Sequence, residues 1–366
     1  MNPIDLRHIL HRHPEPSHEE HETQQILMKA MEELNIPCRA IASTGALGVY
    51  APHDGKPFLL FRADMDALPI EEKTNCTFRS RNDHMHACGH DVHMAILYGL
   101  AKRCSEEKPP VNILFLFQPA EETGGGAREC LEELESLKIS AAFALHVTDE
   151  YPLGTLATRK GVLFASAFEV DCYFKGRAVH ISMHHMGRDA IEGCAEFLEK
   201  IYENMPMDAL LRFGMIEGGK ARNVVADECR LMGSVRSESW ERNEELLKHI
   251  ENVGHEVAVR KDLKFSISTG SMYPPVVVEE SLFENLKNIA SVLNLPFVEC
   301  EMKYTGEDFG FFSQRYPSLM FWLGTRKGKE RYGLHSPYFL PPDEAVNIGI
   351  EVMWNLLIRV QSSNDL

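Results

Sequence analysis

The chain of 366 residues contains no apolar run of about eighteen residues, the length needed to span a membrane. Its first residues, MNPIDLRHIL, lack the basic segment and apolar stretch of a secretory signal. Positive charge is also scarce, because 38 Lys and Arg stand against 54 Asp and Glu, a formal net charge of -16. Such a chain is repelled by nucleic-acid phosphates and anionic membranes. We therefore expect a cytoplasmic protein with neither partner.

The sequence shows no disulfide framework, because its nine cysteines are odd in number and are spread singly along the chain. Each cysteine is then a core filler, an inert thiol, a catalyst or a metal ligand. The composition, 44% hydrophobic and 25% charged, is typical of a folded globular protein. Because single cores stop growing at about 250 to 300 residues, the length predicts two domains.

Three apolar runs predict buried strands with polar groups at their carboxyl ends. They are residues 58–64, with Asp64 and Asp66 at the end, residues 111–117, followed by Glu121 and Glu122, and residues 141–145, followed by His146. Helical patterns over 91–104 and 126–137 separate the runs. This alternation predicts an α/β fold with an open, doubly wound sheet and a site beyond the carboxyl ends of its strands.

The N-terminal segment predicts a helix over 3–12, a proline-rich break and a second helix. Ser17 and Glu20 have the spacing of a capping box at the start of the second helix. Four histidines in this segment are interpreted as solvated or capping residues rather than ligands: His11, His13, His18 and His21.

The middle third of the chain has the order strand, helix, strand, strand, helix, strand, which is that of a ferredoxin-like α+β domain. The predicted elements are residues 167–174, 188–204, 210–217, 227–236, 239–258 and 263–269. After them the chain returns to buried patterns, with a helix over 281–293, an apolar strand over 318–323 and a helix over 342–361. We expect a catalytic domain of residues 1–165 and 273–366, with residues 166–272 inserted into it.

The strongest chemical signal is residues 84–93, HMHACGHDVH, which hold four His, one Cys and one Asp. Imidazole, thiolate and carboxylate concentrated in this way favour a transition-metal site, and the alternative is a His-rich surface loop. Glu121 and Glu122 are adjacent, so one carboxylate can bind metal while the other acts on a metal-bound water. His146 and His335 could each be structural, but the topology brings these groups to one edge of the sheet.

Six motifs occur in an order that resembles the di-metal amidohydrolases and aminoacylases, which include hippurate hydrolases, auxin-conjugate hydrolases and N-acetyldiaminopimelate deacetylases. The motifs are Arg62–Pro69 (RADMDALP), Met85–Asp91 (MHACGHD), Phe117–Glu122 (FQPAEE), Leu145–His146, Gly306–Phe309 (GEDF) and Leu334–His335. The resemblance covers nearly the whole chain. Residues 151–176 and 302–325 look most like the bacterial N-acetyldiaminopimelate deacetylases.

The resemblance implies a centre of two divalent metal ions, which could be zinc, manganese, cobalt or nickel. The matching metal ligands are Cys88, His90, Glu122, His146 and His335, with the Cys88 thiolate bridging the ions. Glu121 matches the general acid/base, and Asp66 matches an acid that orients a group of the site. Asp91 and His93 flank the ligands and are interpreted as supporting or helix-start residues rather than direct ligands.

The inserted segment resembles the family's lid and dimerisation domain, which implies a homodimer. His180 matches a histidine that polarises the substrate carbonyl. Asn223 and Arg236 match positions near the substrate carboxylate, and the alternative for Arg236 is a structural salt bridge. The sequence departs from the family at Ile181–Ser182, where Ala-Ser or Ala-Ala is usual, and at Val92 and Met94. These departures leave the metal ligands in place and concern substrate identity.

The resemblance implies hydrolysis of the amide of an N-acyl amino acid, in the first place an N-acetyl compound such as N-acetyldiaminopimelate. Attack by a hydroxide that bridges the metals is expected, with Glu121 moving the proton. One alternative is a dipeptidase or carboxypeptidase with the same metal centre. Others are a non-catalytic metal-binding protein and an inactive interaction module, and the presence of Glu121 and of all five ligands argues against both.

Overall fold

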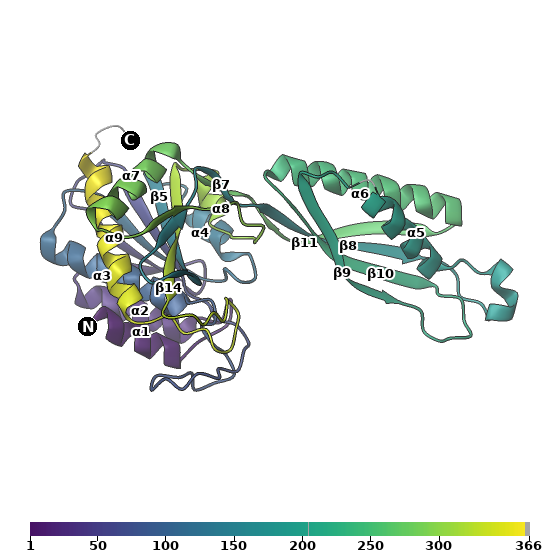
Figure 1. The fold of residues 1–366 in the computed structure, drawn as a ribbon, viewed down its shortest axis with the longest axis horizontal. Coiled ribbons are helices and arrows are strands. Elements are labelled where there is room, and N and C mark those ends of the chain that lie inside the picture. Colours follow the sequence, from purple (N-terminus) through teal and green to yellow (C-terminus); the bar gives the residue numbers. More distant parts are fainter. Residues whose placement is uncertain (204, 363–366) are drawn as a thin grey trace. The chain divides into compact units, whose positions relative to one another are not determined.

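The computed structural model describes residues 1–203 and 205–362, which belong to two compact units (Figure 1). The larger unit comprises Met1–Leu163, Val276–Met302 and the chain from Glu307 onward. The inserted unit comprises Phe164–Pro275 and Lys303–Gly306. Each unit has its own sheet and its own core, so each is described by itself.

The larger unit is built on an eight-stranded sheet. In spatial order its strands are β1 (Cys38–Ile41), β2 (Gly45–Tyr50), β4 (Asn112–Gln118), β3 (Phe58–Asp64), β5 (Ile139–Pro152), β14 (Ser318–Arg326), β6 (Leu156–Thr158) and β13 (Phe297–Glu299). The four central strands β4, β3, β5 and β14 are parallel, β1 and β2 form an antiparallel edge, and β6 is antiparallel to β14. The prediction of an open α/β sheet is confirmed. Because the central strands are parallel, their polar carboxyl ends meet at one edge.

Helices cover this sheet. They are α1 (Pro3–Arg12), α2 (His21–Glu33), α3 (His90–Glu107), α4 (Gly126–Leu134), α7 (Glu280–Val292), the short α8 (Gly310–Ser313) and α9 (Glu344–Ser362). Among the described residues no helix combines the length and apolarity needed to cross a membrane. A further pair of short strands, β7 (Gly161–Phe164) and β12 (Val276–Val278), forms a two-stranded sheet.

Helix α3 is the central helix of the larger unit, because it packs against α1, α9 and β3. Residues 90–101 of α3 are all buried, as expected for a helix with apolar residues on every side. A Cβ atom on Gly99 would overlap Ile350 of α9, and one on Gly349 would overlap Ile96 of α3. These two glycines allow α3 and α9 to approach closely.

The capping box predicted at Ser17 is wrong. Helix α2 begins at His21 with Glu20 as its N-cap, and the Ser17 hydroxyl donates to the Asp66 carboxylate at 2.7 Å. Glu20 is fully buried and accepts the Ala120 N–H at 2.8 Å and the Thr44 hydroxyl at 2.5 Å. Partners distant in sequence therefore take both side chains away from the local motif.

The interpretation of His11 as a solvated or capping residue is also wrong. Its side chain is fully buried, and its Nδ1 lies 3.0 Å from the Asp91 carboxylate of α3. The reason is that α1 packs directly on α3, which turns this face of α1 inward. The other three histidines of the segment are exposed or partly exposed.

The inserted unit has the ferredoxin-like order that the sequence predicts. Its elements are β8 (Ser166–Lys175), the short 3₁₀ helix η1 (Ile181–Met186), α5 (Ala190–Glu203), β9 (Ala209–Gly218), β10 (Glu228–Ser237), α6 (Trp240–Lys261) and β11 (Lys264–Tyr273). The sheet order is β11-β8-β10-β9, with every neighbouring pair antiparallel. Helices α5 and α6 lie on one side of this sheet (Figure 1). Phe174, Phe197 and Leu231 are among the apolar residues of the core between them. Strand β9 is an edge strand.

Candidate metal centre

The structure brings the five predicted metal ligands together beyond the end of β4, at the start of α3 and beside His146, which lies within β5 because that strand continues past the predicted end at residue 145 to Pro152. One ligand atom each from Cys88, His90 and Glu122 lies within 4.8 Å of the others. The His146 Nε2 is 3.3 Å from the Cys88 Sγ, and the His335 Nε2 is 3.4 Å from the Glu122 Oε1. Four of the five side chains are buried or nearly so, and that of His335 is about half exposed.

Two backbone positions with positive φ shape this arrangement. Gly89 has φ +88° and precedes the first residue of α3, where a Cβ atom would overlap the Val147 side chain. It therefore allows Cys88 and His90, on either side of it, to face the same region. Ala120 has φ +52°, and its N–H is held by the buried Glu20 carboxylate. This bond stabilises the turn that presents Glu121 and Glu122.

The donor atoms fit a divalent cation. The His90 Nε2 and the Glu122 Oε1 are buried 4.0 Å apart, and neither has a hydrogen-bond partner among the described residues. A buried polar atom without a partner costs about 1–3 kcal/mol, and a cation between these two atoms would satisfy both. Burial and the nearby Glu122 raise the pKa of the Cys88 thiol, so its thiolate also needs a positive partner. Nitrogen, oxygen and sulfur ligands together suit zinc and related transition metals.

Asp66 holds His90 and Glu122 in place. The His90 Nδ1 lies 2.9 Å from the Asp66 carbonyl oxygen and 3.2 Å from its Oδ1, so the Nδ1–H is directed at Asp66 and Nε2 is left for a metal. The Asp66 Oδ2 accepts the Glu122 N–H at 2.9 Å and the Ser17 hydroxyl at 2.7 Å. One carboxylate therefore connects two of the ligands, as partners of metal ligands commonly do.

His93 has no nitrogen left for a metal. Its Nδ1 lies 2.5 Å from the Asp64 carboxylate, and its Nε2 accepts the Val147 N–H at 2.9 Å. Burial lowers the pKa of His93, which agrees with a neutral ring that donates on one side and accepts on the other. His93 thus positions the backbone next to His146, whose own Nδ1 lies 2.8 Å from the Val147 carbonyl oxygen.

The Asp91 carboxylate makes its contacts on the α1 side of α3. It lies 2.9 Å from the Arg7 Nε and 3.0 Å from the His11 Nδ1. Burial opposes the charge of Asp91, but Arg7 and His11 hold its pKa well below the usual range. Asp91 therefore joins α1 to the first turn of α3, which carries His90.

Glu121 lies in a group of buried acids. Its exposed fraction is 8%, and oxygens of Glu121, Glu307 and Asp308 lie within 4.8 Å of one another. Burial and the charges of Glu307 and Glu122 raise the pKa of Glu121 well above its usual value. A carboxyl group with a raised pKa can both accept and return a proton near neutral pH.

Arg62 supports the site, a role that its place in the motif RADMDALP did not predict. Its fully buried guanidinium donates to Asp64, Gln118 and Asp308, each at 2.8 Å, and lies 3.2 Å from Glu307. It supplies the positive charge that keeps this group of acids buried. The available signal was a lone arginine inside the apolar run FLLFRAD, since a buried cation needs paired anions.

The three residues predicted to contact substrate belong to the inserted unit. His180 and Asn223 lie on neighbouring segments, because the Ile181 N–H donates to the Asn223 carbonyl oxygen at 2.9 Å, and both residues are exposed. Arg236 of β10 donates to the Ser234 hydroxyl at 3.2 Å and to the Tyr304 carbonyl oxygen. Their roles toward substrate stay predictions.

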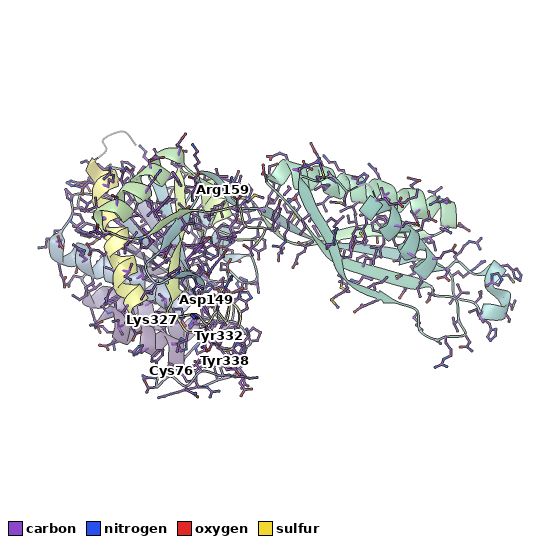
Figure 2. The ribbon with its side chains drawn as sticks, in the orientation of Figure 1. Cys76, Asp149, Arg159, Lys327, Tyr332 and Tyr338 are labelled. Carbon is purple, nitrogen blue, oxygen red and sulfur yellow. The ribbon has the colours of Figure 1, made fainter. Side chains whose placement is uncertain are left out.

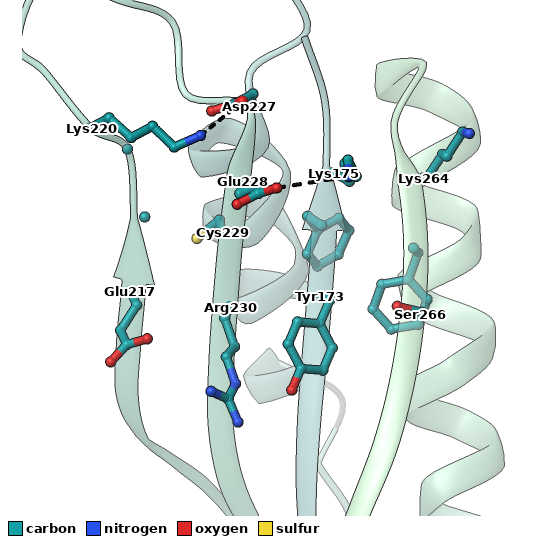
Figure 3. A pocket seen from close by; sticks show the side chains of 14 residues that line it. Tyr173, Lys175, Glu217, Lys220, Asp227, Glu228, Cys229, Arg230, Lys264 and Ser266 are labelled. Atoms are coloured by element: carbon teal, nitrogen blue, oxygen red, sulfur yellow. Dashed lines mark hydrogen bonds and ion pairs between the residues drawn. The ribbon is translucent and has the colours of Figure 1, made fainter. Parts of the chain in front are cut away.

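The inserted unit also has a cavity of about 630 Å³ at the end of its sheet where β8 and β9 finish (Figure 3). Its wall includes two ion pairs, Lys220–Asp227 at 3.1 Å and Lys175–Glu228 at 3.8 Å. None of the predicted site residues lines it. Three further charged residues, Glu217, Arg230 and Lys264, line the cavity outside these two ion pairs.

Comparison with known proteins agrees with this geometry. The family described as peptidase family M20/M25/M40 matches residues 60–359. An N-acetyldiaminopimelate deacetylase of Halalkalibacterium halodurans is 35% identical over 360 residues, which are 95% of this chain and 96% of the relative. The deacetylase of the same name from Bacillus cytotoxicus is 35% identical over 364 residues, 96% of either chain.

Among solved structures, the Bacillus subtilis YXEP protein is described as a dinuclear metal binding peptidase from the M20 family. It superposes on this chain with a TM-score of 0.86 at 28% sequence identity. The match covers 99% of this chain and 98% of that protein, so both units have counterparts in it.

Replacing Arg62 tests the electrostatic balance of the buried acids. Arg62→Met keeps much of the side-chain volume but removes the charge, and we expect a loss of about 3–5 kcal/mol in the free energy of unfolding. Burial already raises the pKa of Asp308 to about 8 with Arg62 present. Without the cation every neighbouring acid binds its proton more tightly in the folded state, so the deficit should grow as the pH rises from 5 to 8.

Denaturant unfolding at several pH values measures both effects. Arg39→Met is the matched control, because Arg39 pairs with Glu133 at 2.8 Å on the surface with both side chains about half exposed. It should change the unfolding free energy by about 1 kcal/mol or less. Equal losses in the two variants, or a deficit that shrinks as the pH rises, would contradict the role given to Arg62.

Proposed function

Because the chain belongs to peptidase family M20/M25/M40, we propose that it is a metal-dependent amidohydrolase that removes the acyl group from an N-acyl amino acid. The observation that carries this proposal is a buried carboxyl, Glu121, beside a cluster of metal-ligand side chains. The relatives named N-acetyldiaminopimelate deacetylase favour an N-acetyl substrate, and N-acetyldiaminopimelate is the first compound to test.

The proposed residues for two divalent cations are Cys88, His90, Glu122, His146 and His335. Zinc, manganese, cobalt and nickel are all compatible with this mixture of donor atoms. Bound there, the cations would supply Lewis acidity that activates water and polarises the acyl carbonyl. Asp66 would keep the His90 ring and the Glu122 backbone in the orientation that binding needs.

Glu121 would move the proton. As a carboxylate it takes a proton from the attacking water, and as a carboxylic acid it gives that proton to the departing amine nitrogen. The raised pKa of Glu121, caused by burial and by neighbouring acids, favours the first half of this cycle, in which the carboxylate takes up the proton. Glu121 then returns to its charged form, so the proton is conserved over one turnover.

The substrate contacts are proposed from the resemblance. His180 would donate a hydrogen bond to the acyl oxygen, where negative charge develops during attack. Arg236 has the planar fork that binds a carboxylate through two parallel hydrogen bonds, and Asn223 would add an amide contact. Amino acids carry the carboxylate that such an arginine recognises.

Glu121→Gln tests the proton transfer. The amide keeps the size of the side chain but cannot accept a proton, so we expect kcat to fall by about 10²–10⁴-fold while the metal content per chain stays at the wild-type value. Acetate release and elemental analysis measure the two quantities. Glu122→Gln is the paired variant and should lose metal as well as activity. Wild-type turnover by Glu121→Gln would overturn the assignment.

An amine-release screen tests the substrate class. N-acetyl, N-benzoyl and N-succinyl amino acids, including N-acetyldiaminopimelate, are compared with dipeptides on the metal-loaded enzyme. A dipeptide carries a free α-amine on the acyl side of its amide, whereas an N-acetyl amino acid carries none. We therefore expect the acetyl compounds to give the highest kcat/KM. Faster cleavage of dipeptides would instead favour the peptidase alternative, which the description of the YXEP protein keeps open.

We also propose that two chains pair through the inserted unit. Strand β9 pairs with β10 and is an edge strand of the four-stranded sheet, and Leu210, Met215 and Ile216 on it are 41%, 56% and 56% exposed. An exposed edge strand with apolar side chains can form a dimer interface with the same strand of a second copy.

Ile216→Lys tests this pairing. A charge on the exposed edge should disfavour association, so we expect sedimentation to show monomers for the variant and dimers for the wild-type chain. Val259→Lys is the matched control, because Val259 is 83% exposed on α6 rather than on the edge strand. A monomeric wild-type chain, or the same mass for wild type, Ile216→Lys and Val259→Lys, would rule out the proposed dimer interface at β9.

A further inference from the structure

A second group of metal-ligand side chains lies in the larger unit and shares no residue with the first. It consists of His11 on α1 and of Glu72 and Cys76 in the segment after β3, here called the His11 cluster. One donor atom from each of the three residues lies within 4.8 Å of the others. Neither the mechanism proposed above nor the family resemblance gives this cluster a role.

The distances in the His11 cluster are close to those of a tetrahedral metal site. The His11 Nε2 is 3.3 Å from the Glu72 Oε2, and the Cys76 Sγ is 3.6 Å from the Glu72 Oε1. Zinc bonds of about 2.0 Å to nitrogen, 2.1 Å to oxygen and 2.3 Å to sulfur place tetrahedral ligands about 3.3–3.6 Å apart. The two distances end on different Glu72 oxygens, so an ion would enter with the Glu72 carboxylate turned to present an oxygen to both His11 and Cys76.

His11 presents the correct nitrogen. Its Nδ1 lies 3.0 Å from the Asp91 Oδ2, and the same oxygen accepts the Arg7 Nε–H at 2.9 Å, which fixes the Asp91 carboxylate. The His11 Nε2 is buried and directed at the cluster, where it lies 3.3 Å from the Glu72 Oε2. A histidine that binds metal through one nitrogen while a carboxylate holds the other is a recurrent arrangement in metal sites.

Glu72 and Cys76 are also held in position. The Glu72 side chain is almost fully buried, its Oε2 accepts the Ser80 N–H at 2.7 Å, and its Oε1 accepts the Thr74 hydroxyl. The Thr74 Oγ1 lies 3.4 Å from the Cys76 Sγ. Cys76 is partly exposed, so an ion and a water molecule could reach the cluster from solvent (Figure 2).

We propose that the His11 cluster binds an additional divalent transition-metal ion, best matched by zinc. Its protein ligands are the His11 Nε2, a Glu72 carboxylate oxygen and the Cys76 Sγ, and water fills the fourth position. The Cys76 thiol releases its proton to solvent when it binds. The ion connects α1 to the segment after β3. The competing arrangement is a protonated His11 that pairs with Asp91 and Glu72 and holds no metal.

Metal stoichiometry tests the proposal. Wild-type holoprotein, Cys76→Ala and Cys38→Ala are each dialysed to equilibrium against the same free zinc concentration, and zinc per chain is measured. We expect Cys76→Ala to hold about one zinc fewer than wild type. Cys38→Ala, which removes a second partly exposed cysteine outside both clusters, should match wild type. Equal zinc content in all three proteins would overturn the proposal.

A spectroscopic measurement separates the two metal sites. In the cobalt-substituted protein, thiolate-to-cobalt absorption arises from Cys88 and, under this proposal, also from Cys76. We expect Cys76→Ala to lose part of this absorption and Cys88→Ser to lose a different part. Unchanged absorption in Cys76→Ala, with a circular dichroism spectrum like that of wild type, would mean that Cys76 binds no metal.

Discussion

The buried guanidinium of Arg62 is the contact on which the larger unit's polar interior depends. It joins β3 to the end of β4 through Gln118 and to the C-terminal segment through Glu307 and Asp308. The positive charge of Arg62 thereby contacts residues that lie far apart in the sequence. Without a cation at this position, several carboxylates would be buried together near Glu121, and their desolvation and mutual repulsion would oppose folding.

In this polar interior, some buried side-chain atoms have hydrogen-bond partners and others have none. Arg62 and His93 have hydrogen-bond partners for their inward-facing groups, and they act as supports. The His90 Nε2 and the Glu122 Oε1 have none among the described residues. Because buried polar atoms are normally hydrogen-bonded, ligand atoms that lie side by side without a hydrogen bond indicate where a cation belongs.

Much of the fold could be predicted from the sequence, because strands and helices of ordinary length have a clear apolar period. The inserted ferredoxin-like unit is an example, since its six elements occur where the sequence predicts them. Short strands such as β1 and β6 span too few residues to show a period and were not predicted. The capping box at Ser17 was wrong because α2 begins at His21, and the Ser17 hydroxyl donates to Asp66, 49 positions away, instead of accepting a backbone N–H at the start of the helix.

The sequence by itself determined which chemistry is available, because the residue types at the ends of buried strands and at the start of α3 can be read in order. The tertiary structure decided which atom of each residue is free. Whether a histidine presents Nδ1 or Nε2 depends on a partner distant in sequence, as with Asp91 beside His11 and Asp66 beside His90. Burial and hydrogen bonding are properties of packed neighbours, so the roles of Arg62 and His11 became visible only when the helices and strands were in place.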